Sequence, residues 1–329
     1  MNKKLILSAS QYGISLLKAK IKPTITFTNL FYTRRCNLSC SYCTAYKKAS
    51  KKELSLKEWK DCSDILYKLG NRSISMVGGE PLIREDVIEF IKYISKKKII
   101  SSLITNAILL NNNKIKELEK AGLINLGIST QSLIPNKKEK CQNPELFDLL
   151  IKHKKNLEIS ALTTITNKNY KEVPEIAKFV IKKGLRFAPN MITSGKNFWF
   201  RNYCPELQFT TKEQKEGLKK TIKELIKIKK ETKKIIYSEH YLKSLYLYAI
   251  NPDFKWYCDA GKNYLSINDD GYVMYCQDLE PTKINYKDLD KYYPLKQNNC
   301  KNCVWPCYYD ESYRIKHPIK FFKENLSEI

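Results

Sequence analysis

Six strand-like segments alternate with helix-like segments between residues 24 and 192, and this alternation constrains the fold more than any other feature. The expected strands are Thr24–Tyr32, Ser73–Val77, Ser101–Thr105, Ile124–Ser129, Glu158–Thr166 and Arg186–Ile192. The expected helices are Leu54–Leu69, Arg84–Lys97, Asn112–Ala121, Pro144–Lys154 and Tyr170–Lys183. Short βα connections predict a parallel sheet with helices on its outer face, which right-handed crossovers would curl toward a barrel. In such sheets, sites form where strands end and the next loop begins.

The chain divides into four expected parts. They are an N-terminal extension, a core barrel, a helical linker and a cysteine-rich extension, at residues 1–23, 24–200, 201–250 and 251–329, respectively. The linker contains one long Lys-rich helix, Thr211–Ile235, with Leu218, Ile222 and Leu225 on a common face. The cysteine-rich part reads as a separate module that is too short and turn-rich to hold a core without metal.

Composition places the protein among folded globular chains, because apolar residues make up 43% and aromatic residues 12%. No run of about 18 continuous apolar residues could span a membrane, and Met1–Lys20 lacks a small-residue cleavage site. We therefore expect a soluble, cytoplasmic protein. The formal charge of +25 could attract nucleic acid. However, Lys, Ile and Asn are abundant from end to end, so compositional drift explains the charge better than nucleic-acid binding.

The eleven cysteines are clustered along the chain. Three fall within eight residues, five fall in the last quarter and three stand alone: Cys36, Cys40 and Cys43; Cys258, Cys276, Cys300, Cys303 and Cys307; Cys62, Cys141 and Cys204. Without a secretion signal, such clustering favours metal binding over disulfides.

The first cluster, Cys36-Asn-Leu-Ser-Cys40-Ser-Tyr-Cys43, follows directly after the first expected strand. Thiolates suit iron–sulfur clusters, and three of them would hold three irons of a cubane while leaving the fourth open. An open metal position can bind and activate a small molecule. The alternatives are a zinc knuckle or three idle thiols. Zinc would need a fourth ligand nearby, whereas the three histidines lie far along the chain, at His153, His240 and His317.

This segment resembles the hallmark of the radical S-adenosylmethionine (SAM) superfamily, C-x3-C-x-aromatic-C, at Cys36, Cys40, Tyr42 and Cys43. The resemblance covers residues 24 to 192 and implies an α/β fold, a partial (β/α)6 TIM-like barrel with a small C-terminal extension. It also implies a [4Fe-4S] cluster whose open iron chelates the amino and carboxylate groups of SAM. Tyr42 would pack near the adenine.

The resemblance implies further SAM contacts at the ends of later strands. Gly78-Gly79-Glu80 would bind the SAM amino group through backbone carbonyls and the carboxylate. Other candidates, for the carboxylate or ribose hydroxyls of SAM, are Thr105, Asn106, Ser129, Gln131 and Asn167. Gln131 departs from the acid that many relatives carry there, which leaves its own role open. For Thr105, Asn106 and Asn167, ordinary strand-end capping is an equal alternative.

The C-terminal cysteines form a second constellation. Cys258 and Cys276 flank Gly271 with C-x12-G-x4-C spacing, and Asp269–Tyr272 predicts a hairpin that would bring the two cysteines together. This spacing resembles the SPASM and shorter twitch extensions of radical SAM enzymes, which implies one auxiliary [4Fe-4S] cluster. Two further ligands would come from Cys300, Cys303 and Cys307, with Cys300 and Cys303 as the first choice. A zinc ribbon is the alternative.

The resemblance implies an enzyme that cleaves SAM reductively to a 5′-deoxyadenosyl radical, which abstracts a hydrogen atom from the substrate. A flavodoxin or ferredoxin would supply the electron. Modification of a peptide or protein is our first prediction, although no peptide-recognition domain is evident before residue 24. The alternative is oxidation or rearrangement of a small molecule, as in twitch-type dehydrogenases or cofactor biosynthesis. A non-catalytic, metal-binding nucleic-acid protein is a distant third possibility.

Overall fold

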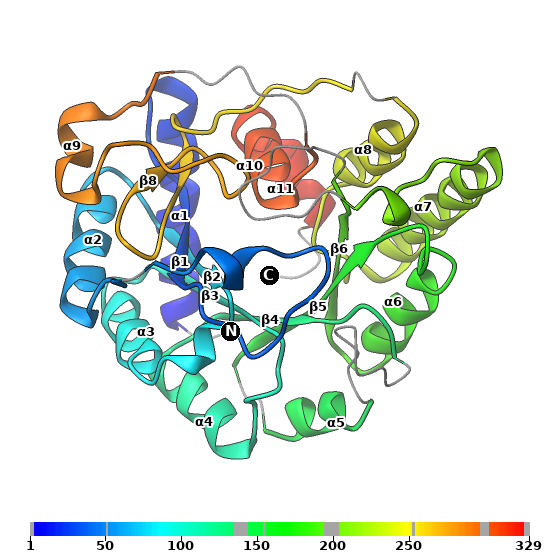
Figure 1. Cartoon of the computed structure of the whole chain (residues 1–329), viewed down its shortest axis with the longest axis horizontal. Coiled ribbons are helices and arrows are strands. Elements are labelled where there is room, and N and C mark those ends of the chain that lie inside the picture. Colours follow the sequence, from blue (N-terminus) through cyan, green and yellow to red (C-terminus); the bar gives the residue numbers. More distant parts are fainter. Residues whose placement is uncertain are drawn as a thin grey trace.

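The computed structural model describes residues 3–50, 52–133, 144–153, 156–193, 204–251, 254–296 and 303–325. Within them, one sheet has the spatial order β6-β5-β4-β3-β2-β1-β7-β8, and Figure 1 shows it curled around a central space. The strands are β1 Phe27–Thr33, β2 Ser73–Gly78, β3 Ile100–Thr105, β4 Asn125–Ser129, β5 Glu158–Ile165, β6 Arg186–Met191, β7 Tyr264–Ile267 and β8 Val273–Met274. Neighbouring strands from β6 to β7 pair in parallel. The predicted α/β class with a partial TIM-like barrel is confirmed.

The helices that follow the first six strands lie around the outside of the sheet (Figure 1). The helices are α1 Lys3–Ile21, α2 Leu56–Lys68, α3 Val87–Lys96, α4 Asn112–Ala121, α5 Pro144–His153, α6 Val173–Lys182, α7 Lys212–Thr232, α8 Glu239–Ile250, α9 Leu289–Tyr292, α10 Pro306–Lys316 and α11 Pro318–Asn325. The predicted long linker helix is α7, which begins at a capping box formed by Thr211 and Gln214. Its predicted apolar face, Leu218, Ile222 and Leu225, is buried.

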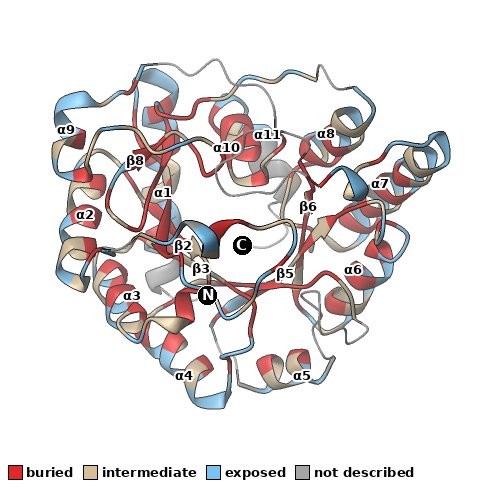
Figure 2. Cartoon of the chain, viewed as in Figure 1, coloured by how far each residue is buried: buried red, intermediate tan, exposed pale blue. Residues whose placement is uncertain are grey.

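Strands in the barrel have two different faces, because successive side chains alternate across a sheet. In β4, Leu126 and Ile128 are fully buried in the core beneath the outer helices. The other three residues, Asn125, Gly127 and Ser129, line a cavity on the inner side. On the surrounding helices, the buried residues lie on the sides that face the sheet (Figure 2). The sheet therefore separates an apolar core from a more polar interior.

The C-terminal part continues the barrel sheet, although its sequence reads as a separate module. β7 pairs in parallel with β1, with Phe27 opposite Tyr264. β8 then returns antiparallel to β7, which confirms the predicted hairpin. The segment is also less turn-rich than expected, because Pro306 begins α10 at a position that suits proline. One face of α10 lines the cavity, so this helix closes the barrel on its open side.

The N-terminal extension forms the helix α1, which the sequence analysis does not anticipate. Leu16 and Ala19 of α1 pack against Ile315 of α10. The spacing of Tyr12, Leu16 and Ala19 along one helical face was the available signal. Within the described part of the chain, no helix has both the length and the apolar character needed to cross a bilayer.

Candidate active site and metal centres

The three clustered cysteines lie in the loop after β1, where the parallel strands end. Cys40 is buried, while Cys36 and Cys43 are half-buried. The Cys43 amide donates to the Cys40 carbonyl at 3.0 Å, and the Leu38 amide donates to the Cys36 sulfur at 3.4 Å. These backbone bonds fold the loop into a compact turn that carries all three thiols at one end of the barrel.

Gly78 and Gly79 let this loop approach the end of β2. The Gly79 amide donates to the Thr33 carbonyl and the Glu80 amide to the Arg35 carbonyl, both at 2.8 Å. A Cβ atom at Gly79 would lie 2.1 Å from the Arg35 carbonyl oxygen, and one at Gly78 would lie 2.0 Å from that of Thr33. Only glycine fits such close backbone contact. The Gly-Gly pair thus positions the chain that leads into Cys36.

Glu80 joins the ends of β2 and β3. Its fully buried carboxylate accepts hydrogen bonds from the Thr105 hydroxyl at 2.7 Å and from the Asn106 amide at 2.7 Å. The Leu82 amide donates to the same carboxylate at 3.1 Å. Glu80 is not among the residues that line the cavity. The contact of Glu80 with the SAM amino group therefore stays a prediction. In the structure its hydrogen bonds join the end of β2 to the end of β3.

Asn106 connects β3 to the cysteine loop. Its side-chain amide donates to the Asn37 side chain at 2.7 Å and lies 4.0 Å from the Cys36 sulfur. Its carbonyl oxygen accepts from the Ile108 amide at 3.1 Å. The structure therefore brings the Thr-Asn pair against the cysteine motif, as a shared site requires.

A cavity of about 1090 Å³ runs inside the barrel. Seven of the nine predicted SAM contacts line it: Tyr42, Gly78, Gly79, Thr105, Asn106, Ser129 and Gln131. Cys43 also lines it, so one predicted cluster ligand faces the same space. Gln131 is held in place because its side-chain carbonyl accepts from the Thr164 amide at 2.7 Å.

Asn167 lies outside this group. It does not line the cavity, and its side-chain amide donates to the carbonyls of Glu206 and Gln208 at 3.0 and 2.7 Å. It therefore anchors the 3₁₀ turn Pro205–Leu207, which is about 40 residues away in sequence.

A buried ion pair that the sequence analysis missed ties the cysteine loop to the C-terminal hairpin. Arg34 lies 3.6 Å from Asp269, and both side chains are almost completely buried. The Ser50 amide and hydroxyl donate to the same carboxylate at 2.9 and 2.7 Å. Burial lowers the pKa of Arg34 to about 10, while Asp269 opposes that shift. The two partners are far apart in sequence, so no local pattern indicated the pair.

The second site gathers Cys258, Cys276, Cys303 and Cys307 around β7 and the start of α10. Cys258, Cys276 and Cys307 pack in one cluster with Tyr264 and Tyr308. Cys303 lies close enough to Cys258 and Cys276 for their charges to raise its pKa. The hairpin thus brings Cys258 near Cys276, as predicted. Cys300 and Cys141 lie outside the described residues.

In the second site Cys276 is buried, and Cys258, Cys303 and Cys307 are half-buried. Burial raises the pKa of the Cys307 thiol to about 12 and those of Cys276 and Cys303 well above the ordinary value. Nearby Asp278, which accepts from the Trp305 indole at 2.6 Å, raises all three further. A metal centre deprotonates a coordinating thiol and compensates its charge. This four-thiol donor set therefore fits an iron–sulfur cluster.

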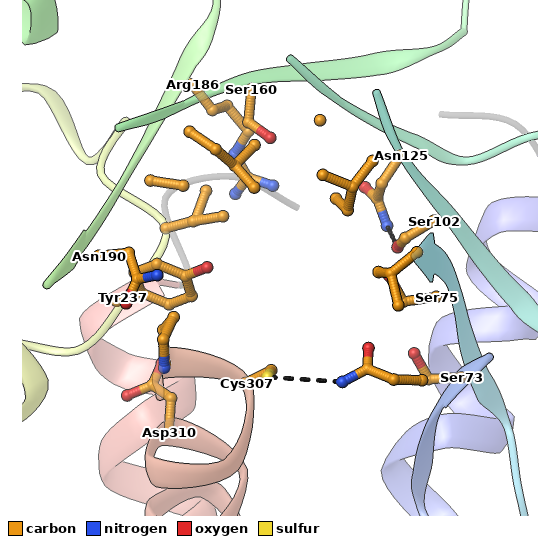
Figure 3. A pocket seen from close by; sticks show the side chains of 18 of the residues that line it. Ser73, Ser75, Ser102, Asn125, Ser160, Arg186, Asn190, Tyr237, Cys307 and Asp310 are labelled. Atoms are coloured by element: carbon orange, nitrogen blue, oxygen red, sulfur yellow. Dashed lines mark hydrogen bonds between the residues drawn. The ribbon is translucent and has the colours of Figure 1, made fainter. Parts of the chain in front are cut away.

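Polar groups also surround these sulfur atoms. The Asn29 side-chain amide lies 3.8 Å from the Cys307 sulfur, the contact dashed in Figure 3, and the Tyr264 hydroxyl lies 3.3 Å from the Cys258 sulfur. Hydrogen bonds to sulfur tune the potential of a cluster. Among the described residues, no three Cys, His, Asp or Glu side chains form a tight group around a single metal position.

Residues 30–180 match the family model described as "Radical SAM superfamily", so this part of the chain is a radical SAM domain. GTP 3′,8-cyclase from Aquifex aeolicus is 31% identical over 201 residues, which cover 56% of this chain and 62% of that protein. PqqA peptide cyclase from Bradyrhizobium diazoefficiens is 38% identical over 103 residues, 31% of this chain and 27% of that protein. The chain thus spans less than two thirds of either relative.

Solved structures share the fold at low identity. Streptococcus suis SuiB, in a crystal structure bound to precursor peptide SuiA, superposes with a TM-score of 0.65 and 18% identity, over 89% of this chain and 70% of SuiB. The anSMEcpe structure with bound AdoMet and the Cp18Cys peptide has a TM-score of 0.56 and 16% identity, over 93% of this chain and 98% of that one. These identities establish a shared fold alone.

Proposed function

We propose that the protein is a radical SAM enzyme with a [4Fe-4S] cluster on Cys36, Cys40 and Cys43. The observation that carries the proposal is the position of the cysteine loop, at the edge of a cavity lined by seven candidate SAM contacts. The three thiolates would hold a reduced cluster whose electron would split SAM into methionine and a 5′-deoxyadenosyl radical, and this radical would take a hydrogen atom from the substrate.

The chain's own residues position the reactants and keep water away. Gly78 and Gly79 hold the cysteine loop against β2, and Glu80 fixes the neighbouring strand ends. Tyr42 and Asn106 would border SAM on the side of the cluster, and Ser129 and Gln131 on the side of the substrate. Enclosure by the barrel and α10 would protect the radical from solvent.

A second, auxiliary [4Fe-4S] cluster of SPASM or twitch type is proposed on the C-terminal cysteines. The gathering of Cys258, Cys276, Cys303 and Cys307 supports these four as the ligands. Four thiolates would leave no open iron, so this cluster would not bind SAM. Cys307 lines the cavity, which gives the cluster a side that faces the substrate.

The substrate class is proposed as a peptide or protein. The names of PqqA peptide cyclase and the SuiB and anSMEcpe complexes support this class. The likeness to GTP 3′,8-cyclase supports the second candidate, a small molecule. Coexpression with short peptides encoded beside the gene, followed by mass spectrometry, would separate the two. A mass change in one peptide supports the first candidate, and unchanged peptides favour the second.

Electron paramagnetic resonance tests the open iron directly. Protein reconstituted under nitrogen and reduced by a flavodoxin, ferredoxin or dithionite should give a cluster signal that changes when SAM is added. The Cys258→Ala/Cys276→Ala variant should keep this response, and Cys62→Ala is a matched control at a buried thiol outside both sites. If the signal did not change on addition of SAM in any of these proteins, the assignment of an open iron to the first cluster would be refuted.

A further inference from the structure

The interior of this barrel is hollow, and its lining combines small polar side chains with apolar ones. Barrels of this type are normally filled by layers of bulky branched side chains. Here small polar residues face inward from successive strands, and Figure 3 shows Ser73, Ser75, Ser102, Asn125 and Ser160 around the open space. The cavity therefore extends the full depth of the barrel, from Cys43 at the strand ends to residues at the strand starts.

The deep end of the cavity is closed by residues from both chain termini. Tyr12 of α1 donates a hydrogen bond to Glu311 of α10, and Arg314 donates to the Tyr12 hydroxyl at 3.3 Å. Arg314 also lies 3.7 Å from Asp310, whose carboxylate accepts from the Ser238 hydroxyl at 2.5 Å. Both α10 carboxylates are thus engaged with described partners. These contacts between α1 and α10 close the cavity at the end where the strands begin.

Arg186 brings a further guanidinium into the deep end. It begins β6, and Figure 3 shows its side chain reaching inward beside Ser160 and above Asn190. Burial lowers the pKa of Arg186, and the nearby Arg314 charge lowers it further. Glu158, at the start of β5, offsets part of this effect. Asp310 and Glu311 lie 3.7 and 3.6 Å from Arg314, so these charges offset one another. The Arg186 guanidinium comes from β6 instead and presents its donors to the cavity.

We propose that Arg186 binds a carboxylate of the substrate at the deep end of the cavity. The planar guanidinium presents donors in a fork that matches a carboxylate. A singly charged group suits this place better than a doubly charged phosphate, because Glu158, Asp310 and Glu311 also line the deep end. The inference rests on the proposed function, since it names a chemical feature of that enzyme's substrate.

The proposal fixes how a substrate would lie. Arg186 and Met191 are five residues apart on β6, which corresponds to about 16 Å along the strand. A carboxylate held at the start of β6 would place the rest of the molecule along the cavity toward the cysteine loop. Two sources have this chemistry: an acidic side chain of a peptide, or a free small acid.

Calorimetric titration of the reconstituted holoprotein with SAM tests the proposal without requiring turnover. The probes are glutarate with its neutral diamide, N-acetylglutamate amide with N-acetylglutamine amide, and inorganic phosphate. Wild-type protein should bind each acid more tightly than its amide. Arg186→Gln should weaken acid binding by about tenfold or more, and Arg186→Lys should weaken it less. Glu158→Gln should tighten it by about threefold, because a competing negative charge is removed.

The matched control is Arg72→Gln, which removes an arginine that bonds the Tyr67 and Asn71 carbonyls outside the cavity. It should bind the acids as wild type does. Tighter binding of N-acetylglutamate amide than of glutarate would assign a peptide source, and the reverse a free acid. The proposal would be overturned if wild-type protein bound no acid, bound acid and amide equally, or bound phosphate more tightly than the acids. It would also be overturned if a folded Arg186→Gln protein kept full affinity for the acids. Formation of 5′-deoxyadenosine by wild type tests the proposed function separately.

Discussion

The two cysteine sites are assembled in opposite ways. Cys36, Cys40 and Cys43 come from one short loop, and Cys43 lines the cavity. The second site draws four thiols from the segments that flank the β7–β8 hairpin and from the start of α10, where Cys258, Cys276 and Cys307 pack with Tyr264 and Tyr308. Three thiols from one loop suit a cluster with one open iron, whereas four thiols from several segments suit a cluster held entirely by protein.

The comparison also separates what local sequence encodes from what tertiary packing adds. The first site depends on backbone contacts that glycine alone permits, and on a buried ion pair with the hairpin. The second site depends on the sheet, because the pairing of β7 with β1 places the flanking Cys258 and Cys276 beside Cys307 at the start of α10. Each dependence can be broken by a single substitution.

The largest effect is expected at the first site from Gly79→Ala. The added methyl group would collide with the Arg35 and Arg34 carbonyl oxygens, so the cysteine loop must move. SAM cleavage should fall by about a hundredfold or more, since small displacements of reacting groups have effects of this size. Gly184→Ala is the control for backbone strain, because Gly184 has a positive φ, which Gly79 lacks, but nothing lies near its Cβ position. Equal loss in both variants would mean that general strain, not the loop, is responsible.

A smaller effect is expected from Asp269→Asn, which removes one partner of the buried pair. Arg34 would remain buried without its carboxylate, and the free energy of unfolding should fall by about 3 kcal/mol. Urea denaturation of the reconstituted protein measures this change. Asp290→Asn, at an exposed aspartate, should change stability by less than about 0.5 kcal/mol. A similar small change at Asp269 would show that the hairpin does not stabilise the cysteine loop.

The smallest effect concerns Lys229, a buried residue of α7 near Asp310 of α10. Burial lowers its pKa from 10.5 to about 8, although the Asp310 charge opposes the shift. Between these two values the unfolded chain holds a proton that the folded protein has released, so this group makes stability rise with pH. The stability of wild type relative to Lys229→Met should increase by about 1 to 2 kcal/mol between pH 7.5 and 9.5. Urea titrations of both proteins at both pH values measure this change. The ionisation of the cysteines affects wild type and Lys229→Met equally, so it cancels when their free energies of unfolding are subtracted. A constant difference would contradict it.

Much of the barrel could be predicted because its signals are local. The alternation of segments gave the six barrel strands, and the spacing from Cys36 to Cys43 located the first site. The hairpin at Asp269–Tyr272 followed from turn chemistry. These features depend on residues that are close in sequence, which patterns can report.

The remaining features depend on contacts between distant segments. Nothing local indicated that β7 would extend the sheet beside β1, that Arg34 would meet Asp269, or that α1 would close the barrel. The approach of Cys307 to Cys258 and Cys276 depends on where α10 begins. Glu80 matches a motif, yet its bonds to Thr105 and Asn106 appear only when β2 and β3 lie side by side.

The central claim is that the first site alone cleaves SAM while the second serves the substrate. The most direct measurement is formation of 5′-deoxyadenosine without substrate, together with iron content, in anaerobically reconstituted variants. Wild type should hold about eight irons, and each site variant about four. Changing Cys36, Cys40 and Cys43 to Ala should abolish cleavage, whereas the folded Cys258→Ala/Cys276→Ala protein should retain at least about half of it, since four-thiolate ligation leaves no open iron. Undiminished cleavage in the triple variant, or complete loss in the double variant, would contradict the account.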